Sequence, residues 1–195
     1  SPKTEMRISF TSILILLAAS LLAQQNPMPM GMLNGKASVA MRGEVKGELQ
    51  LTPEQQTRSQ REVDAIGSVP VAESASGMLG PLERLDANIK PILSDDQWKR
   101  LTELWIQFEG PFVLQSPEIA DALKLDDEVR KKISDTSMKY TAWWRKEIAK
   151  VRKSADLGRI RGEARKVSGK LLGFLNKAQR EQFSKMEGQK FRFQT

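Results

Sequence analysis

The sequence predicts an all-α fold, an elongated helical hairpin or bundle with one long C-terminal helix in which we expect a bend. Three observations support this prediction. A helix-start motif recurs four times, residues 95–109 repeat apolar side chains at helical spacing, and residues 127–174 contain no proline. With 195 residues, of which 39% are hydrophobic, the chain has the size of a single domain. We expect the helical domain to cover residues 51–195.

The best copy of the helix-start motif is Leu51-Thr52-Pro53-Glu54-Gln55. Thr52 can accept a hydrogen bond from the Gln55 amide, and the Gln55 side chain can reach back to the Thr52 amide, which together make a capping box. Pro53 suits the first helical position, where no N–H is needed. The pattern recurs in weaker form at Leu93, Ser94 and Gln97, at Leu125 and Asp126 with Val129 in place of Gln, and at Leu175, Asn176 and Gln179.

The N-terminus has the pattern of a signal peptide over residues 1–23. Met6-Arg7 is a short basic start, residues 8–22 are almost wholly apolar, and we expect cleavage near Ala23. The apolar run is shorter than the ~20 residues that a membrane-spanning helix needs. The protein is therefore expected to be periplasmic or secreted, and an uncleaved membrane anchor is the alternative.

Residues 24–50 are predicted to form a flexible leader. From Gln24 to Glu48 the chain holds two Pro and four Gly, and its apolar residues follow no period. Such a segment buries too little apolar surface to offset the entropy of ordering its backbone. Its four Met residues suit a soft metal ion such as Cu(I), but in a loose segment they are more often incidental.

Four helices are predicted between this leader and residue 125. The first covers 53–66 and is followed by a Gly- and Ser-rich loop at 67–80, and the second covers 81–90. The strongest covers 95–109, where Gly110-Pro111 ends it. A short fourth helix begins at Ser116-Pro117. The apolar stripe of the strongest helix consists of Trp98, Leu101, Leu104, Trp105 and Phe108.

The proline-free segment 127–174 is predicted to be a long helix. As one straight helix it would extend ~72 Å at about 1.5 Å per residue. Each glycine inside it costs ~1 kcal/mol relative to Ala, and the segment holds four, at 158, 162, 169 and 173. These glycines lie on one stripe, so they either permit a close helix crossing or mark a hinge near residues 154–158. We expect a bend there, and hence a hairpin or a curved two-part helix.

The residue inventory offers little for catalysis. The chain has no Cys and no His, which removes disulfides, thiol nucleophiles, Cys/His zinc sites and His acid–base chemistry. Its acidic pairs stand in the first turns of predicted helices, where the helix dipole accounts for them. We therefore expect no enzyme activity, no catalytic or metal site and no cofactor.

A basic segment is the main candidate for binding. Residues 139–170 hold eleven Lys or Arg (139, 145, 146, 150, 152, 153, 159, 161, 165, 166 and 170) against three acidic residues (147, 156 and 163). Trp144 continues an apolar seam and is predicted to be core, whereas Trp143 points away from that seam. A solvated helix face is the alternative interpretation. The candidate binding residues are Tyr140, Trp143, Arg145, Lys146, Lys150 and Lys153.

The repeated Leu-Thr/Ser-x-x-Gln units, in a small Cys-free chain with a predicted signal peptide, resemble the LTxxQ proteins of the Spy/CpxP type. The resemblance covers four short motifs, of which Leu51 to Gln55 is the one ideal copy. It implies a helical, periplasmic protein of the envelope stress response. It further implies an ATP-independent chaperone that holds unfolded clients on a basic, partly apolar surface, and a homodimer.

Two functional classes follow. The first is a secreted or periplasmic chaperone or stress protein whose partners are unfolded proteins. The second is a structural, envelope-associated protein that binds an anionic membrane or cell-wall polymer through the basic helical face. A nucleic-acid partner fits the charge but conflicts with the predicted signal peptide, so none is expected.

Overall fold

The computed structural model of this protein describes residues 35–67, 79–152 and 154–193, and every regular element in these ranges is a helix. The predicted all-α class is therefore confirmed. The predicted signal peptide, residues 24–34 of the leader and Lys153 lie outside the described residues. The elements are α2 (Lys36–Ala40), α3 (Gly43–Glu48), α4 (Pro53–Gly67), α5 (Leu79–Ile89), η2 (Lys90–Ile92), α6 (Asp95–Glu109), η3 (Gly110–Gln115), α7 (Pro117–Ala122), α8 (Asp127–Ile148), α9 (Ser154–Gly173) and α10 (Lys177–Met186).

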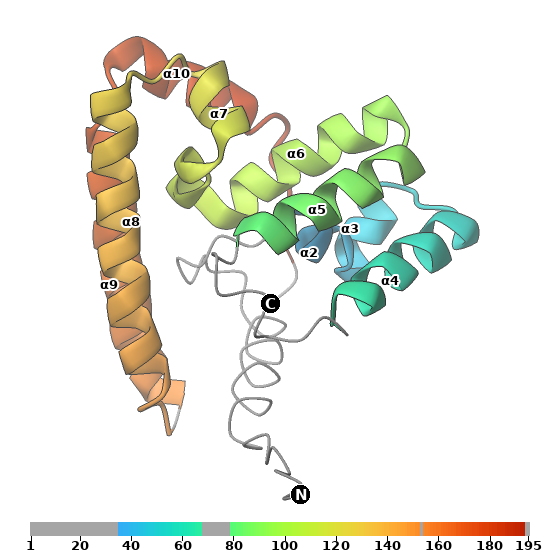
Figure 1. The fold of residues 1–195 in the computed structure, drawn as a ribbon, viewed down its shortest axis with the longest axis horizontal. Coiled ribbons are helices and arrows are strands. Elements are labelled where there is room, and N and C mark those ends of the chain that lie inside the picture. The colour runs from blue at the N-terminus through green and yellow to red at the C-terminus, as the bar shows by residue number, and fades with distance from the viewer. Residues whose placement is uncertain (1–34, 68–78, 153, 194–195) are drawn as a thin grey trace, which may run out of the picture.

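The segment predicted as one long helix is two helices that form a hairpin. α8 ends at Ile148 and α9 begins at Ser154, and the two lie side by side at the left of Figure 1. The turn thus falls a few residues before the expected bend, and Gly158 and Gly162 lie inside a continuous helix. Helices α2 to α7 gather in a compact group beside this hairpin (Figure 1), so the expected elongated shape of the whole chain is not confirmed.

The prediction of a flexible leader is wrong for residues 36–49. This stretch forms α2 and α3, and most of its apolar side chains are buried in the main core. The Asp86 carboxylate of α5 accepts the backbone N–H groups of Lys36 and Ala37 at 3.0 and 2.9 Å, so it caps α2 from another helix. The local sequence carries no helical period, and tertiary contacts order it instead. Its buried apolar residues are Ala37, Val39, Ala40, Val45 and Leu49.

The core forms around α6, whose predicted apolar stripe points inward. Leu101 and Leu104 are fully buried, and Trp105 and Phe108 are nearly so. η3 follows directly and buries Phe112, Val113 and Leu114. Because η3 packs against α6, α8 and α9, it attaches the hairpin to the rest of the molecule. Each such large apolar side chain contributes about 1.5–3 kcal/mol on burial.

Each copy of the motif starts a helix. Thr52 Oγ1 accepts from the Gln55 amide at 3.2 Å, while Gln55 Oε1 accepts from the Thr52 amide at 3.0 Å. Ser94 with Gln97 and Asn176 with Gln179 form the same reciprocal box. The copy at Leu125 has only the cap: Asp126 accepts from the Val129 amide at 2.8 Å, and valine offers no side-chain acceptor in return. The leucines before the caps, Leu51, Leu93, Leu125 and Leu175, are all buried.

The motifs also bind one another in pairs. Gln55 Nε2 donates to the Ile92 carbonyl at 2.9 Å, and Gln97 Nε2 donates to the Leu49 carbonyl at 3.0 Å. The two side-chain amides also bond to each other. In the second pair, Gln179 Nε2 donates to the Leu123 carbonyl at 3.3 Å. The motif glutamines therefore join the starts of distant helices, which a capping box alone does not require.

Candidate functional site

Five of the six candidate binding residues lie in the second half of α8 and in the turn that follows it, and the sixth, Lys153, lies outside the described residues. Tyr140 is buried against the Phe112 ring, with ring centroids 5.3 Å apart. This burial raises the pKa of the Tyr140 hydroxyl well above its usual value. The prediction of Tyr140 as a surface contact is therefore wrong: the apolar seam of α8 runs through this position and faces η3.

The two adjacent tryptophans differ in burial, as their positions around the helix predict. Trp144 is buried in the core, as predicted. Trp143 is half-buried, because one part of its ring packs toward Tyr140 at 5.6 Å between centroids. The Arg159 guanidinium of α9 lies 5.9 Å from the centroid of the Trp143 ring, within the range of a cation–π contact. Trp143 therefore offers an aromatic edge beside a cation rather than a freely exposed ring.

Glu147 joins the two helices of the hairpin near their turn. Its carboxylate is largely buried and accepts from Lys150 at 2.9 Å, and its other oxygen bonds to Arg159. These hydrogen bonds, from Lys150 first and then Arg159, hold the pKa of Glu147 below its usual range. The charge of Lys150, a predicted binding residue, is thus partly neutralised by Glu147.

Most other cations of the hairpin have no such partner. Arg145 and Lys146, both predicted as binding residues, are exposed. Within the described part of the chain they form no ion pair, in contrast to Lys131 and Lys132 nearer the start of α8, which bond to Asp135 and Glu128. The hairpin cations without an ion pair among the described residues are Lys139, Arg145, Lys146, Arg161, Arg165 and Lys170.

The glycines of α9 lie on its outward face. At 3.6 residues per turn, the four fall within about 60° of one another around the helix axis. A Cβ atom added at any of them would meet nothing within 4 Å. Within the described part of the chain no helix crosses close to them, which corrects one of the two roles expected for them. Arg161 and Arg165 flank the stripe on one side, and Arg159, Lys166 and Lys170 flank it on the other.

The hairpin surface is hydrophilic. Among the residues that the structure describes, Met138 is the one large apolar side chain classed as exposed, at 58% of its full area. The other large apolar side chains of the hairpin that reach the surface are only partly exposed, as Trp143, Ile148 and Val151 are. Lys and Arg side chains lie instead beside the glycine stripe of α9.

In residues 35–67, 79–152 and 154–193, no three acidic side chains gather as they would around a metal ion. The exposed acidic pair at the start of α6 lies in the first helical turn, where it faces the positive end of the dipole. None of the helices in these ranges combines the length and apolar content that crossing a bilayer requires.

A scan against protein-family models and searches of curated proteins and of solved structures found no match. The resemblance to the LTxxQ proteins therefore stays a prediction that rests on the four motifs.

Proposed function

We propose that this protein is a non-enzymatic, envelope-associated binding protein that takes hold of an anionic membrane or cell-wall polymer through the basic hairpin α8–α9. The supporting observation is the set of hairpin cations that lack an ion pair among the described residues. A cation already paired within its own chain gains little from a new anion, whereas an unpaired, exposed cation keeps its full charge available. This proposal keeps the predicted periplasmic or secreted location.

The charge is concentrated in the hairpin. Residues 139–170 carry a formal charge of +8, from eleven basic and three acidic side chains, and the whole chain carries +7, so the rest of the chain sums to −1. A surface of this kind orients the protein toward an anionic layer with the hairpin leading. The compact group of helices then serves as the scaffold that holds the hairpin.

The chaperone hypothesis has weaker support from the surface. Met138 is the exposed large apolar side chain of α8, and Val129, Trp143 and Ile148 are partly buried against the core. We keep it as the second candidate because Trp143 stands beside Arg159, an arrangement that suits an aromatic or acidic segment of an unfolded chain. In that case the protein suppresses aggregation of a diluted, denatured client without ATP.

Vesicle co-sedimentation tests the proposal. We expect the chain to sediment with vesicles that contain an anionic phospholipid, less so at higher salt, and not with phosphatidylcholine alone. A lysine or arginine near an anionic surface is worth about 1 kcal/mol. Replacing Arg145, Lys146, Arg165 and Lys170 by Gln should therefore lower the affinity at least ~10-fold.

A matched control lies on the same helix. Lys131→Gln with Lys132→Gln removes charges that are already paired, so it should change vesicle binding little. A loss of binding free energy half as large as that of the fourfold variant, in proportion to two charges removed instead of four, would show that total charge rather than the hairpin face drives binding. Absence of vesicle binding, together with suppression of client aggregation, would favour the chaperone.

A further inference from the structure

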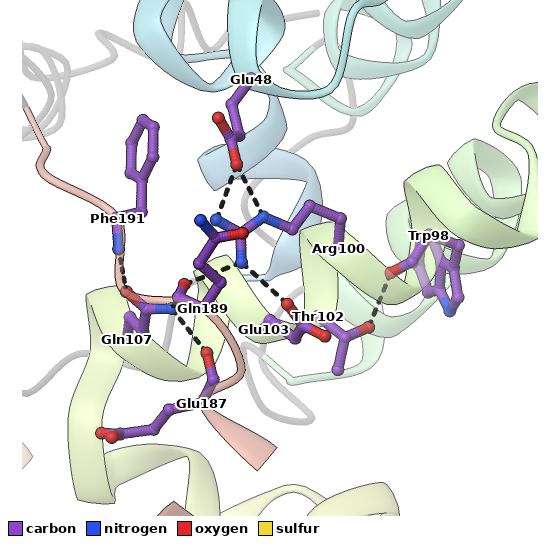
Figure 2. A network of polar contacts seen from close by, with 9 residues as sticks. All are labelled: Glu48, Trp98, Arg100, Thr102, Glu103, Gln107, Glu187, Gln189 and Phe191. Atoms are coloured by element: carbon purple, nitrogen blue, oxygen red, sulfur yellow. Dashed lines mark hydrogen bonds and ion pairs between the residues drawn. The ribbon is translucent and has the colours of Figure 1, made fainter. Parts of the chain in front are cut away.

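The C-terminal segment 187–193 is bound to α6 in a way that resembles a ligand more than a structural element. After α10 the chain turns at Gly188, which has a φ of +60°, and continues without helix or strand. Figure 2 shows this segment beside Arg100 and Gln107 of α6. Its cations Lys190 and Arg192 are exposed, and its aromatic residues Phe191 and Phe193 are half-buried.

The polar contacts that α6 makes reach the backbone of this segment. Gln107 Nε2 donates to the carbonyls of Glu187 and Gln189 at 2.5 and 2.8 Å, and Gln107 Oε1 accepts from the Phe191 amide at 2.9 Å. Arg100 adds a bond to the Gln189 carbonyl at 2.8 Å. Backbone donors and acceptors are common to every peptide, so these contacts fit any extended segment.

The side-chain contact is aromatic. Phe193 meets Phe108 edge to face, with centroids 5.3 Å apart, and meets Phe191 in the same manner at 5.0 Å. The Arg42 guanidinium lies 5.0 Å from the centroid of the Phe108 ring. This combination selects an aromatic side chain over a polar one, since ring pairs gain from edge-to-face contact beyond simple burial.

Arg100, at one end of the receiving surface, is also held by contacts that do not involve the tail. Arg100 bonds to Glu48 of α3 at 2.6 Å and to Glu103 of its own helix at 2.8 Å (Figure 2). Phe108 belongs to the buried stripe of α6. Arg100 is therefore positioned without the tail, and the tail itself has no regular structure and only half-buried aromatic anchors, which are marks of a segment that opens easily.

We propose that Arg100, Gln107 and Phe108 form a binding site for extended peptides that carry two aromatic residues with one residue between them, and that residues 187–193 occupy this site as a displaceable internal ligand. The partner is a protein segment of that chemistry, read through its backbone by Gln107 and through its aromatic side chain by Phe108. This site lies on α6 and does not depend on the function proposed for the hairpin.

Peptide binding by the full chain tests this proposal. The probe is a fluorescein-labelled peptide with the sequence of residues 187–193, and the readout is fluorescence anisotropy. In the wild-type chain the tethered tail competes at high effective concentration, so the peptide should bind weakly. With Phe191→Ala and Phe193→Ala the tail is weakened, and we expect affinity for the peptide to rise at least ~10-fold.

Two controls make the result specific. Adding Gln107→Leu to the tail variant removes the backbone contacts and should abolish the gain, and a peptide with both Phe replaced by Ala should not bind. Failure of the helical tail variant to bind the peptide would overturn the proposal, as would binding that survives Gln107→Leu. Circular dichroism establishes that the variants keep their helices.

A measurement on the wild-type chain decides the matter if the tail variant loses helicity. The Phe191 amide bonds to Gln107 Oε1, so its hydrogen exchange is slowed while the tail is in place. Adding excess unlabelled peptide should speed up exchange at this amide, because the peptide displaces the tail. Unchanged exchange at a high excess of peptide would show that the tail is a fixed part of the fold.

Discussion

Gln97 makes hydrogen bonds in two directions, which explains why its position carries glutamine and not glutamate. Its Oε1 accepts from the Ser94 amide, as a glutamate oxygen also could. Its Nε2 donates to the Leu49 carbonyl and to Gln55 Oε1, which a carboxylate cannot do. The glutamine thus ties the start of α6 to the end of α3 and the start of α4.

Replacing Gln97 by Glu should lower the free energy of unfolding by about 1–3 kcal/mol, because the Leu49 carbonyl loses its donor and faces a carboxylate. Urea unfolding followed by circular dichroism measures the change. Gln189→Glu is the control, since the Gln189 side chain is exposed and makes none of these bonds. Equal stability of the two variants would mean that the motif glutamine acts only as a cap.

At the scale of the element, the four glycines of α9 lower the stability of the helix, and no close contact at these positions requires a glycine. Each Gly→Ala change at 158, 162, 169 or 173 should raise the free energy of unfolding by about 0.5–1 kcal/mol, because alanine favours the helix and meets open space. Thermal unfolding of the single variants and of the fourfold variant checks this. A loss of stability would show that a partner segment packs on this face.

Gly188 provides the opposite control. It has a positive φ, and a Cβ atom there would lie 2.2 Å from Glu103. Gly188→Ala should therefore destabilise the protein, which separates glycines that the backbone needs from those that it does not.

The interaction of Glu147 with Lys150 and Arg159, which joins the two helices of the hairpin, also depends on pH. The pKa of Glu147 is lower in the folded protein than its usual value of 4.5, so this interaction stabilises the hairpin above that value. This stabilisation is lost as the pH falls through the lowered pKa and Glu147 takes up a proton. Glu147→Gln should accordingly destabilise the protein near neutral pH.

The difference between Glu147→Gln and the wild type should shrink in acid, because the wild-type carboxyl is then neutral as well. Urea unfolding of both proteins at neutral pH and well below pH 4.5 measures it. Lys166 pairs with Glu163 on the surface of α9, so Glu163→Gln is a control with a small effect at either pH. A constant difference at all pH values would rule out the ionised Glu147 as the cause.

At the scale of the whole molecule, the N-terminal helices α2 and α3 belong to the same core as α6. A chain that begins at Leu51 lacks the buried side chains of Val45 and Leu49 and the Glu48 partner of Arg100. We expect it to unfold at a lower temperature and less cooperatively than a chain that begins at Gly35. Circular dichroism on heating compares the two. An unchanged midpoint would restore the idea of a dispensable leader.

Much of the fold was predictable from local patterns, and the candidate site only in part. The helix at 95–109 combines a capping box, an apolar stripe and a terminal Gly-Pro, and all three signals are local. Which side chains of the basic segment are buried could not be predicted from the local sequence alone. Tyr140 lies on the same apolar seam of α8 as Trp144, but its loss as a surface contact follows from the position of η3, which covers it with Phe112.

The sequence by itself determined that the protein is helical, where its capped helices begin, and that its positive charge is concentrated between residues 139 and 170, because caps, apolar periods and charges are properties of short stretches of chain. Tertiary structure alone decided that α2 and α3 join the core, that Gln55 and Gln97 meet, and that the C-terminal segment lies on Gln107. Each of these contacts joins residues about 40 to 80 positions apart, and no local pattern encodes which distant partner a backbone amide or carbonyl will find.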